Sequence, residues 1–436
     1  MWPLPDGRLG LRPHPPHGDD AARCAYHRRL AGRLDDRAAR VRHLLAAGAN
    51  PAELLEDLEE LVAEGLPARA WPLVQTTIAH ATGATAHRLG ELLARLALAL
   101  EAVEPQEEAL LAVQRTRGRE DPLEKLVRGW LAYHRGDKQG AQRYLAGVPP
   151  WADDDLEQWR CALEVACTYT QGESAVEALL TKLRPWAAVS AGRRALLKGL
   201  EGHLRYRQSR FREAAGLHAE AAEGSVGIRR LKALQQRANA LLDGLEPEAA
   251  DHAADTLYTS ARAVGHAAFE TTAVYLRRSS ALRRLEPLPP DPELVAAAGA
   301  VRANLEALVA YVEACIAWRA GDLPTCRSLA GHAAQVFARA SEPYQAVFCD
   351  ALRLSAGGHV SPARVAELTE IAAEVTTAPP GRLPPGIGIQ VLALLNHAGL
   401  GPFEIPAELL TARPTSQHNA RLELLSINEA LGLGRA

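Results

Sequence analysis

Few residues of this 436-residue chain have the types and spacing that catalysis requires. The sequence contains no Gly-Lys dipeptide, so it has no P-loop for phosphate, and no G-x-G-x-x-G follows a strand pattern. The motifs H-E-x-x-H, C-x-x-C and G-x-S-x-G are also absent. Because distant residues can still assemble an active site, this absence lowers the enzyme hypothesis without removing it. We expect a protein that is not an enzyme and has no cofactor.

Metal and carboxylate chemistry find little support either. Cys24 and His27 are spaced C-x-x-H, but a structural zinc site needs four ligands and no second pair lies nearby. Acidic clusters such as residues 56–60 and 153–155 are typical of helix ends and solvated helix faces. The sequence therefore predicts no metal site and no catalytic pair of carboxylates.

The informative pattern is an aromatic residue followed by a base. Aromatic residues are scarce, with 7 Trp, 9 Tyr and 5 Phe in the whole chain. Three segments nevertheless align without gaps, namely residues 129–141, 202–214 and 314–326. Each begins with a small residue and has an aromatic residue four positions on, with a basic residue directly after it. A glycine or serine follows seven positions after the first residue, and a small residue follows twelve positions after it.

Helices are the elements that must position these residues. Ala and Leu dominate the 47% hydrophobic content, which favours helix over strand. Residues 52–63 place leucines at helical spacing with acids opposite, Asn50-Pro51 is a helix start, and Gly65 is a stop. No Asn-Gly or Asp-Gly hairpin joins two alternating apolar runs. The sequence predicts an all-α fold.

The helices repeat at regular spacing. Gly136, Gly172, Ser209 and Gly244 are 36, 37 and 35 residues apart, and glycine suits such turns because it accepts positive φ after a helix. Gly321 lies 77 residues beyond Gly244, which leaves room for one long unit around the proline-rich residues 285–292. The pattern resembles the tetratricopeptide repeat over residues 119–395, with a possible start near residue 50.

This resemblance implies a right-handed α-solenoid of about eight to ten stacked helical hairpins, a TPR-like superhelix whose first helices line a concave surface. The proline-rich stretches 285–292 and 378–386 are candidate joints. We expect four parts, which are a flexible arm at residues 1–18, helical repeats or a cap at 19–118, the solenoid at 119–400 and a capping helix at 401–436.

In the tetratricopeptide family, the first helix of each unit points three residues into the groove. They are the residue after the conserved small residue and the pair four and five after it. Such rings and cations suit an extended partner chain, whereas the same aromatic position also serves packing between repeats. Both roles stay open. The resemblance thus implies these partner-binding residues: Trp130, Tyr133, His134, Tyr169, His203, Tyr206, Arg207, Trp318 and Arg319.

The charge of the chain limits the class of partner that it can bind. The chain carries 49 Lys and Arg against 52 Asp and Glu, a net charge of −3, so it is not a generally basic nucleic-acid binder. Basic runs at residues 205–212, 229–237 and 277–284 are interspersed with acids, which favours a solvated face over an acidic protein partner, and either over nucleic acid. No apolar run is long enough for a secretory leader or a membrane span, so we expect a cytoplasmic protein without membrane contact.

We expect an adaptor or regulatory subunit that holds a protein or peptide partner in its groove. Two alternatives remain. One is a switch that responds to a small anionic effector or a signal peptide, and the other is a solenoid that binds nucleic acid. The sequence leaves the partner's identity and the oligomeric state open.

Overall fold

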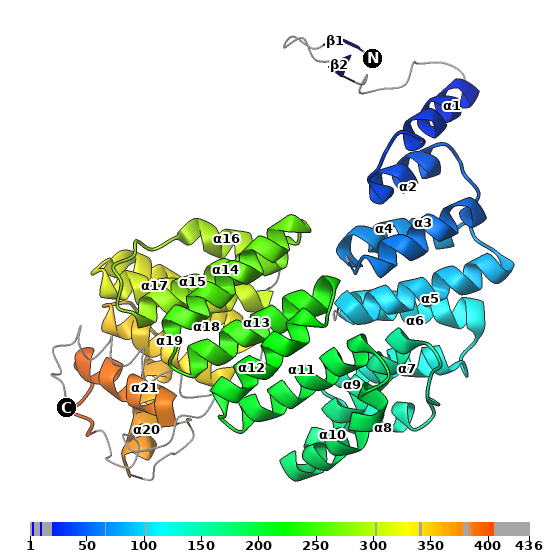
Figure 1. Cartoon of the computed structure of the whole chain (residues 1–436). Coiled ribbons are helices and arrows are strands. Elements are labelled where there is room, and N and C mark those ends of the chain that lie inside the picture. The colour runs from blue at the N-terminus through cyan, green and yellow to red at the C-terminus, as the bar shows by residue number, and fades with distance from the viewer. Residues whose placement is uncertain are drawn as a thin grey trace. The chain divides into compact units, whose positions relative to one another are not determined.

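The computed structural model describes residues 2–3, 9–10, 20–65, 67–100, 103–300, 303–339, 342–377, 383 and 385–404 (Figure 1). Apart from two strands of two residues each, all regular structure in these ranges is helical, which confirms the all-α prediction. The strands β1 (Trp2–Pro3) and β2 (Leu9–Gly10) pair antiparallel. The chain divides into two compact units, residues 1–186 with 226–229 and residues 187–225 with 230–436.

The first unit contains helices in consecutive pairs. They are α1 (Asp20–Ala31), α2 (Arg37–Ala46), α3 (Pro51–Ala63), α4 (Pro67–Ile78), α5 (Gly83–Leu100), α6 (Val103–Arg117), α7 (Pro122–His134), α8 (Lys138–Leu145), α9 (Asp154–Thr168), the 3-10 turn η1 (Tyr169–Gln171) and α10 (Glu173–Ala187). From α1 to α9 each helix packs on the next, and α3, α5, α7 and α9 also contact one another in sequence order (Figure 1). This is the packing of a helical solenoid.

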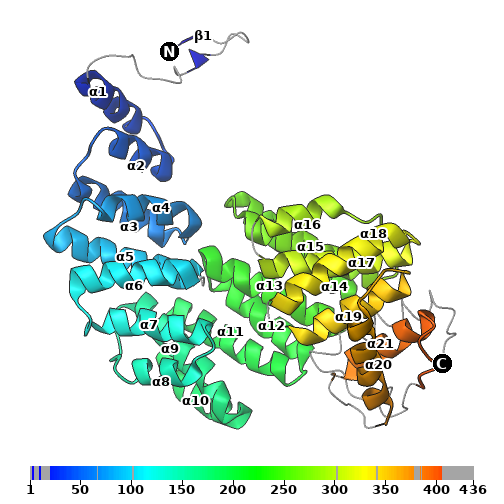
Figure 2. The ribbon, with the colours of Figure 1, turned by 180° about the vertical axis from the view of Figure 1, so that it is seen from behind.

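The second unit continues the same scheme with its own helices. They are α11 (Ala191–Arg207), α12 (Phe211–Glu223), α13 (Gly227–Asp243), α14 (Pro247–Ala263), α15 (Ala267–Arg283), α16 (Pro292–Gly299), α17 (Ala303–Arg319), α18 (Leu323–Arg339), α19 (Pro343–Ser355), α20 (Pro362–Thr377) and α21 (Pro385–His397). Within it α17 packs on α18 and α18 on α19, while α15 reaches α17 and α19 reaches α21 (Figure 2). The handedness of the superhelix stays a prediction.

Helix boundaries follow the local signals of the sequence. Helix α3 begins at Pro51, where the side chain of Asn50 accepts a hydrogen bond from the backbone N–H of Ala52. Its leucines Leu54, Leu58 and Leu61 are fully buried in one face, as the helical spacing predicts.

From α7 to α19, a turn residue with positive φ follows the first helix of each unit. These turn residues are Gly136, Gly172, Ser209, Leu245, Leu285, Gly321 and Gly357, which are 36, 37, 36, 40, 36 and 36 residues apart. The long interval ends at Leu285, where the sequence left room for one extended unit. The expected turn residue Gly244 is one position off, because Leu245 has the left-handed φ of 62°. Gly244 is small for another reason, since a Cβ there would lie 3.0 Å from the Cβ of Phe211.

Small residues let paired helices approach closely. A Cβ on Gly129 in α7 would lie 2.9 Å from Leu163 Cδ2 in α9. A Cβ on Gly202 in α11 would lie 2.9 Å from the imidazole of His218 in α12. These glycines are the first positions of two aligned segments, so the pattern of small residues reports helix crossings.

Five of the six cysteines lie inside the helical layers. Cys161, Cys167, Cys315, Cys326 and Cys349 are buried thiols without disulfides, as the scattered spacing predicts. Burial raises the pKa of Cys161 and of Cys326 to about 12. These side chains therefore act as small apolar residues in the core.

Two predictions concern the ends of the chain. In the predicted arm at residues 1–18, only the four residues of β1 and β2 are described, and its flexibility lies outside the described residues. The predicted capping helix at 401–436 also lies outside them, except for residues 401–404. None of the described helices combines the length and apolar character that crossing a membrane requires.

The buried His218 makes the packing of α11 on α12 sensitive to acid. Burial, and then the nearby His203, lower the pKa of His218 from 6.5 to about 4, so the folded protein keeps the ring neutral where the unfolded chain protonates it. Stability is therefore complete above pH 6.5 and falls by about 3 kcal/mol as the pH drops from 6.5 to 4. Hydrogen exchange in α11 and α12 at pH 7 and pH 5 measures this loss.

The replacement His218→Leu removes the titrating ring and is expected to flatten this pH dependence. His359→Leu, at an exposed histidine, serves as the control and keeps it. An equal pH dependence in the wild type and in His218→Leu contradicts the assignment.

Candidate functional site

The predicted residues of α7 form an aromatic cluster inside the first unit. Trp130 is only 7% exposed, and its Nε1 donates a hydrogen bond to the backbone oxygen of Trp159 at 3.2 Å. The Trp130 ring meets those of Tyr133 and Trp159 edge to face, both at 5.7 Å. His134 Nδ1 lies 3.0 Å from Gln106 Oε1 in α6. Trp130 therefore ties α7 to α9, and His134 ties α7 to α6.

Three other predicted residues differ in exposure. Tyr169 is half-buried and begins the turn η1. His203 and Arg207 are exposed and lie one helical turn apart on α11. Among the nine predicted residues, these two have the accessibility that partner contact needs.

Tyr206 links the ends of neighbouring first helices in the second unit. Its hydroxyl donates a hydrogen bond to Asp243 Oδ2 at the end of α13, and burial followed by the Asp243 charge raises the pKa of Tyr206 well above its usual range. The hydroxyl thus stays protonated and keeps donating. Asp243 Oδ1 in turn lies 3.8 Å from Nη1 of Arg283, and both side chains are about 4% exposed. The guanidinium of Arg283 also donates to the backbone oxygen of Leu242.

Arg319 repeats this arrangement one unit later. It donates to the backbone oxygen of Leu282 at 3.3 Å and to that of Leu285, which are carbonyls at the C-terminal end of α15. A cation is stabilising there because the C-terminal end of a helix carries partial negative charge. Its neighbour Trp318 is buried and meets the ring of His397 at 5.6 Å. The base after the aromatic residue therefore connects one unit to the unit before it.

The arginines of the basic run at residues 277–284 lie within ion-pair distance of carboxylates. Arg278 pairs with Glu313, Arg284 with Asp251, and Arg277 lies 3.1 Å from Asp255. These ion pairs leave few cations of this run to attract phosphate.

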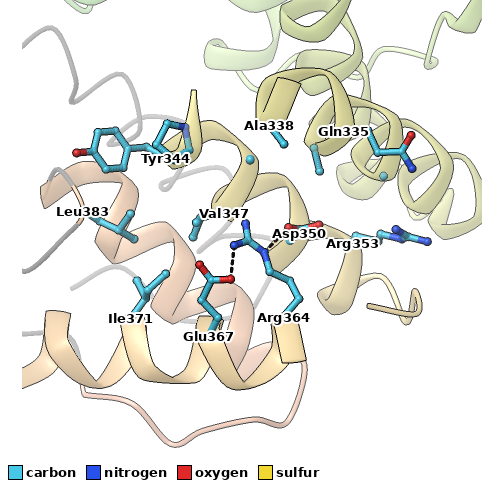
Figure 3. A pocket seen from close by; sticks show the side chains of 14 residues that line it. Gln335, Ala338, Tyr344, Val347, Asp350, Arg353, Arg364, Glu367, Ile371 and Leu383 are labelled. Carbon is cyan, nitrogen blue, oxygen red and sulfur yellow. Dashed lines mark hydrogen bonds and ion pairs between the residues drawn. The ribbon is translucent and has the colours of Figure 1, made fainter. Parts of the chain in front are cut away.

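The second unit also contains an open groove of about 560 Å³. Helices α18 and α20 supply walls on either side of α19, and Figure 3 shows Ile371, Val347 and Leu383 facing it. Tyr344 stands at one end and is 40% exposed. The groove is apolar at this end and charged toward the other.

An ion-paired triad occupies the middle of the groove. Arg364 Nε donates to Asp350 Oδ2 at 2.8 Å, and its Nη1 donates to Glu367 Oε2 at 2.7 Å (Figure 3). Burial lowers the pKa of Arg364, but these hydrogen bonds outweigh burial and raise it above the usual value. The carboxylates of Asp350 and Glu367 thus both accept hydrogen bonds from the guanidinium of Arg364. The ionisable side chains that line the groove are Tyr344, Asp350, Arg353, Arg364 and Glu367.

The sequence patterns did not single out this groove. Its one local signal is Gly331, a glycine inside the helical pattern of residues 323–339, which indicates close approach of another group. No group of three or more His, Cys, Asp or Glu side chains in the described residues is arranged to hold a metal ion.

No model of a protein family matches this chain, and a search of curated proteins finds no significant match. The resemblance to tetratricopeptide repeats therefore continues to rest on the spacing of residues and turns. Partner contact by the nine predicted residues stays a prediction.

The Tyr206 contact yields a test that separates packing from partner contact. Tyr206→Phe removes the hydroxyl that bonds to buried Asp243, and we expect it to lower the free energy of unfolding by about 1–3 kcal/mol. Chemical denaturation measures the change. Tyr344→Phe, at an exposed ring, is the matched control and is expected to change stability by less than about 0.5 kcal/mol. Equal stabilities of the two variants would exclude a structural role for the Tyr206 hydroxyl.

Proposed function

We propose that this protein is a helical-repeat adaptor that binds a segment of another protein and performs no chemistry of its own. The observation that supports this role most directly is the groove bordered by α18, α19 and α20 in the second unit. Its volume of about 560 Å³ lies within the range of about 300–1,000 Å³ that is typical of ligand sites. The solenoid packing and the scarcity of catalytic groups agree with this role.

The composition of the groove fits a peptide better than a compact metabolite. An exposed Tyr344 at one end supplies a flat apolar surface, and small side chains such as Ala334 and Ala338 leave room along α18. The paired charges of Arg364, Asp350 and Glu367 give polar groups at a fixed place. An apolar anchor with polar flanks is the composition that protein interfaces favour.

This surface differs from the one that the repeat pattern predicts. The partner-binding residues predicted from the repeat pattern lie on first helices such as α11, where His203 and Arg207 are exposed. Helices α18 and α20 are second helices. Both surfaces are compatible with a scaffold or regulatory subunit of the tetratricopeptide type. We favour the groove because its apolar lining is open.

A smaller pocket supports the alternative function of a switch that responds to a small anionic effector. It measures about 310 Å³ and is lined by the predicted residue Arg319 together with Ile316 and residues 286–289 of the proline-rich stretch. A small anionic effector bound here would act on the predicted joint. A thermal-shift screen of organic anions tests it, and the absence of any stabilisation counts against it.

The groove is tested by blocking it. We expect peptides selected from a random display library against the whole protein to bind at least tenfold more weakly to Ala338→Trp, because the indole fills the groove. Fluorescence anisotropy with a labelled selected peptide measures the affinity. Ala297→Trp places the same bulk at an exposed position of α16 and is expected to leave binding unchanged.

Binding at the predicted residues of α11 would contradict the groove proposal. If the selected peptides bind Ala338→Trp as well as the wild type but lose affinity for the double variant His203→Ala with Arg207→Ala, the partner surface is α11 and the groove proposal is wrong.

A further inference from the structure

Two arginines beside the groove have no assigned role. Arg353 in the last turn of α19 lines the groove at the end opposite Tyr344 (Figure 3). Arg327 lies in α18, and both side chains are half-buried. They belong to neighbouring helices that pack directly on each other.

The stems of these arginines converge on one glycine. A Cβ on Gly358 would lie 2.7 Å from Arg353 Cγ and 3.1 Å from Arg327 Cγ. The two Cγ atoms are therefore at most 5.8 Å apart, since both lie so close to one point. Gly357, the residue before, has a φ of +74° that turns the chain sharply after α19. The turn thus leaves space for two long cationic side chains at one place.

Neither guanidinium has a hydrogen-bond or ion-pair partner among the described residues. The nearest carboxylates along the chain already accept other hydrogen bonds, because Asp350 accepts from Arg364 and Asp322 caps α18 through the N–H of Thr325. Arg277, Arg278, Arg284 and Arg364 of the same unit all lie within ion-pair distance of carboxylates. Arg327 and Arg353 differ from them, because no carboxylate of the described residues neutralises either cation, and both can therefore pair with an anion from outside.

We propose that Arg327 and Arg353 form a receptor for carboxylates and that the segment bound in the groove is an acidic peptide. The apolar part of the groove would take an aliphatic or aromatic side chain, and flanking Asp or Glu residues would reach the two guanidinium groups. Arginine suits this role because its planar fork binds a carboxylate through two parallel hydrogen bonds. The inference rests on the proposed function and specifies the chemistry of the partner.

Gly331 supplies independent support. It stands in the middle of the 17-residue helix α18, where glycine costs about 1 kcal/mol relative to alanine. A Cβ there would lie 3.3 Å from Cζ, Nε and Nη1 of Arg353, so the absence of a side chain at Gly331 lets the guanidinium pack closely on α18. The helix thus gives up stability at a position that the Arg353 guanidinium contacts.

The C-terminal end of α19 also attracts a cation, which is the competing explanation for Arg353. That explanation does not account for Arg327, which lies in the first turns of α18. It also does not account for the close packing of the Arg353 guanidinium on Gly331. It also predicts that removing Arg353 changes stability without changing which ligands bind.

The test is a display selection with a 12-residue random library against the full chain and against the double variant R327Q/R353Q. We expect the wild type to enrich peptides with Asp or Glu beside an apolar anchor and the double variant to enrich peptides without acids. A selected acidic peptide should bind the double variant at least tenfold more weakly, and replacing its acids by Gln should cause a similar loss in the wild type. Rising salt should weaken binding to the wild type.

Two further variants keep the test independent of folding. Gly331→Ala preserves every charge and raises helix propensity, yet displaces the Arg353 guanidinium, so we expect a stable protein with weaker acidic-peptide binding. Arg230→Gln removes one exposed cation from α13 and is expected to leave binding unchanged.

The outcomes separate the two proposals. Peptides that are blocked by Ala338→Trp but carry no excess of acids leave the adaptor function standing and overturn the acidic-partner inference. Acidic peptides that bind the double variant as tightly as the wild type overturn it as well. Inorganic pyrophosphate binding as tightly as any selected peptide would mean a receptor for free anions, which also overturns it. Failure to select any peptide that Ala338→Trp blocks contradicts both proposals.

Discussion

The apolar face of each helical hairpin in this protein can be covered only by the next hairpin. A pair such as α17 and α18 has no sheet or central core to pack on, so it needs α15 before it and α19 behind it. This need for a neighbour explains why small residues recur at helix crossings and why turns come at nearly constant spacing.

The ends of the first helices carry a second, polar set of links. Tyr206, Asp243 and Arg283 connect three successive first helices of the second unit, and Arg319 connects the next one through backbone carbonyls. These groups are buried or half-buried, so removing one partner is expected to have a large effect on stability. The same positions would serve a partner where the side chain is exposed, as it is at Arg207 of α11.

The sequence predicts much of the fold because its signals are local. Asn50-Pro51 starts a helix and Gly136 forms the turn after α7, both through interactions within a few residues. The groove is not predictable in this way, since it requires α18, α19 and α20 to be placed together. The basic run at residues 277–284 is another example, because its partners Asp251 and Glu313 lie about 30 residues away in sequence. Composition reports the charges, and only the packing of helices reports which charges are already neutralised.

The buried thiols of the chain have a practical consequence. Cys315, Cys326 and Cys349 lie on three successive helices, and burial raises the pKa of each, so a thiol reagent meets neither the surface nor the thiolate it needs. Cys24 in α1 is only partly covered. The rate at which a thiol reagent labels each buried cysteine therefore measures how often the helix that carries it opens. The chain carries natural reporters that can show where a solenoid begins to come apart.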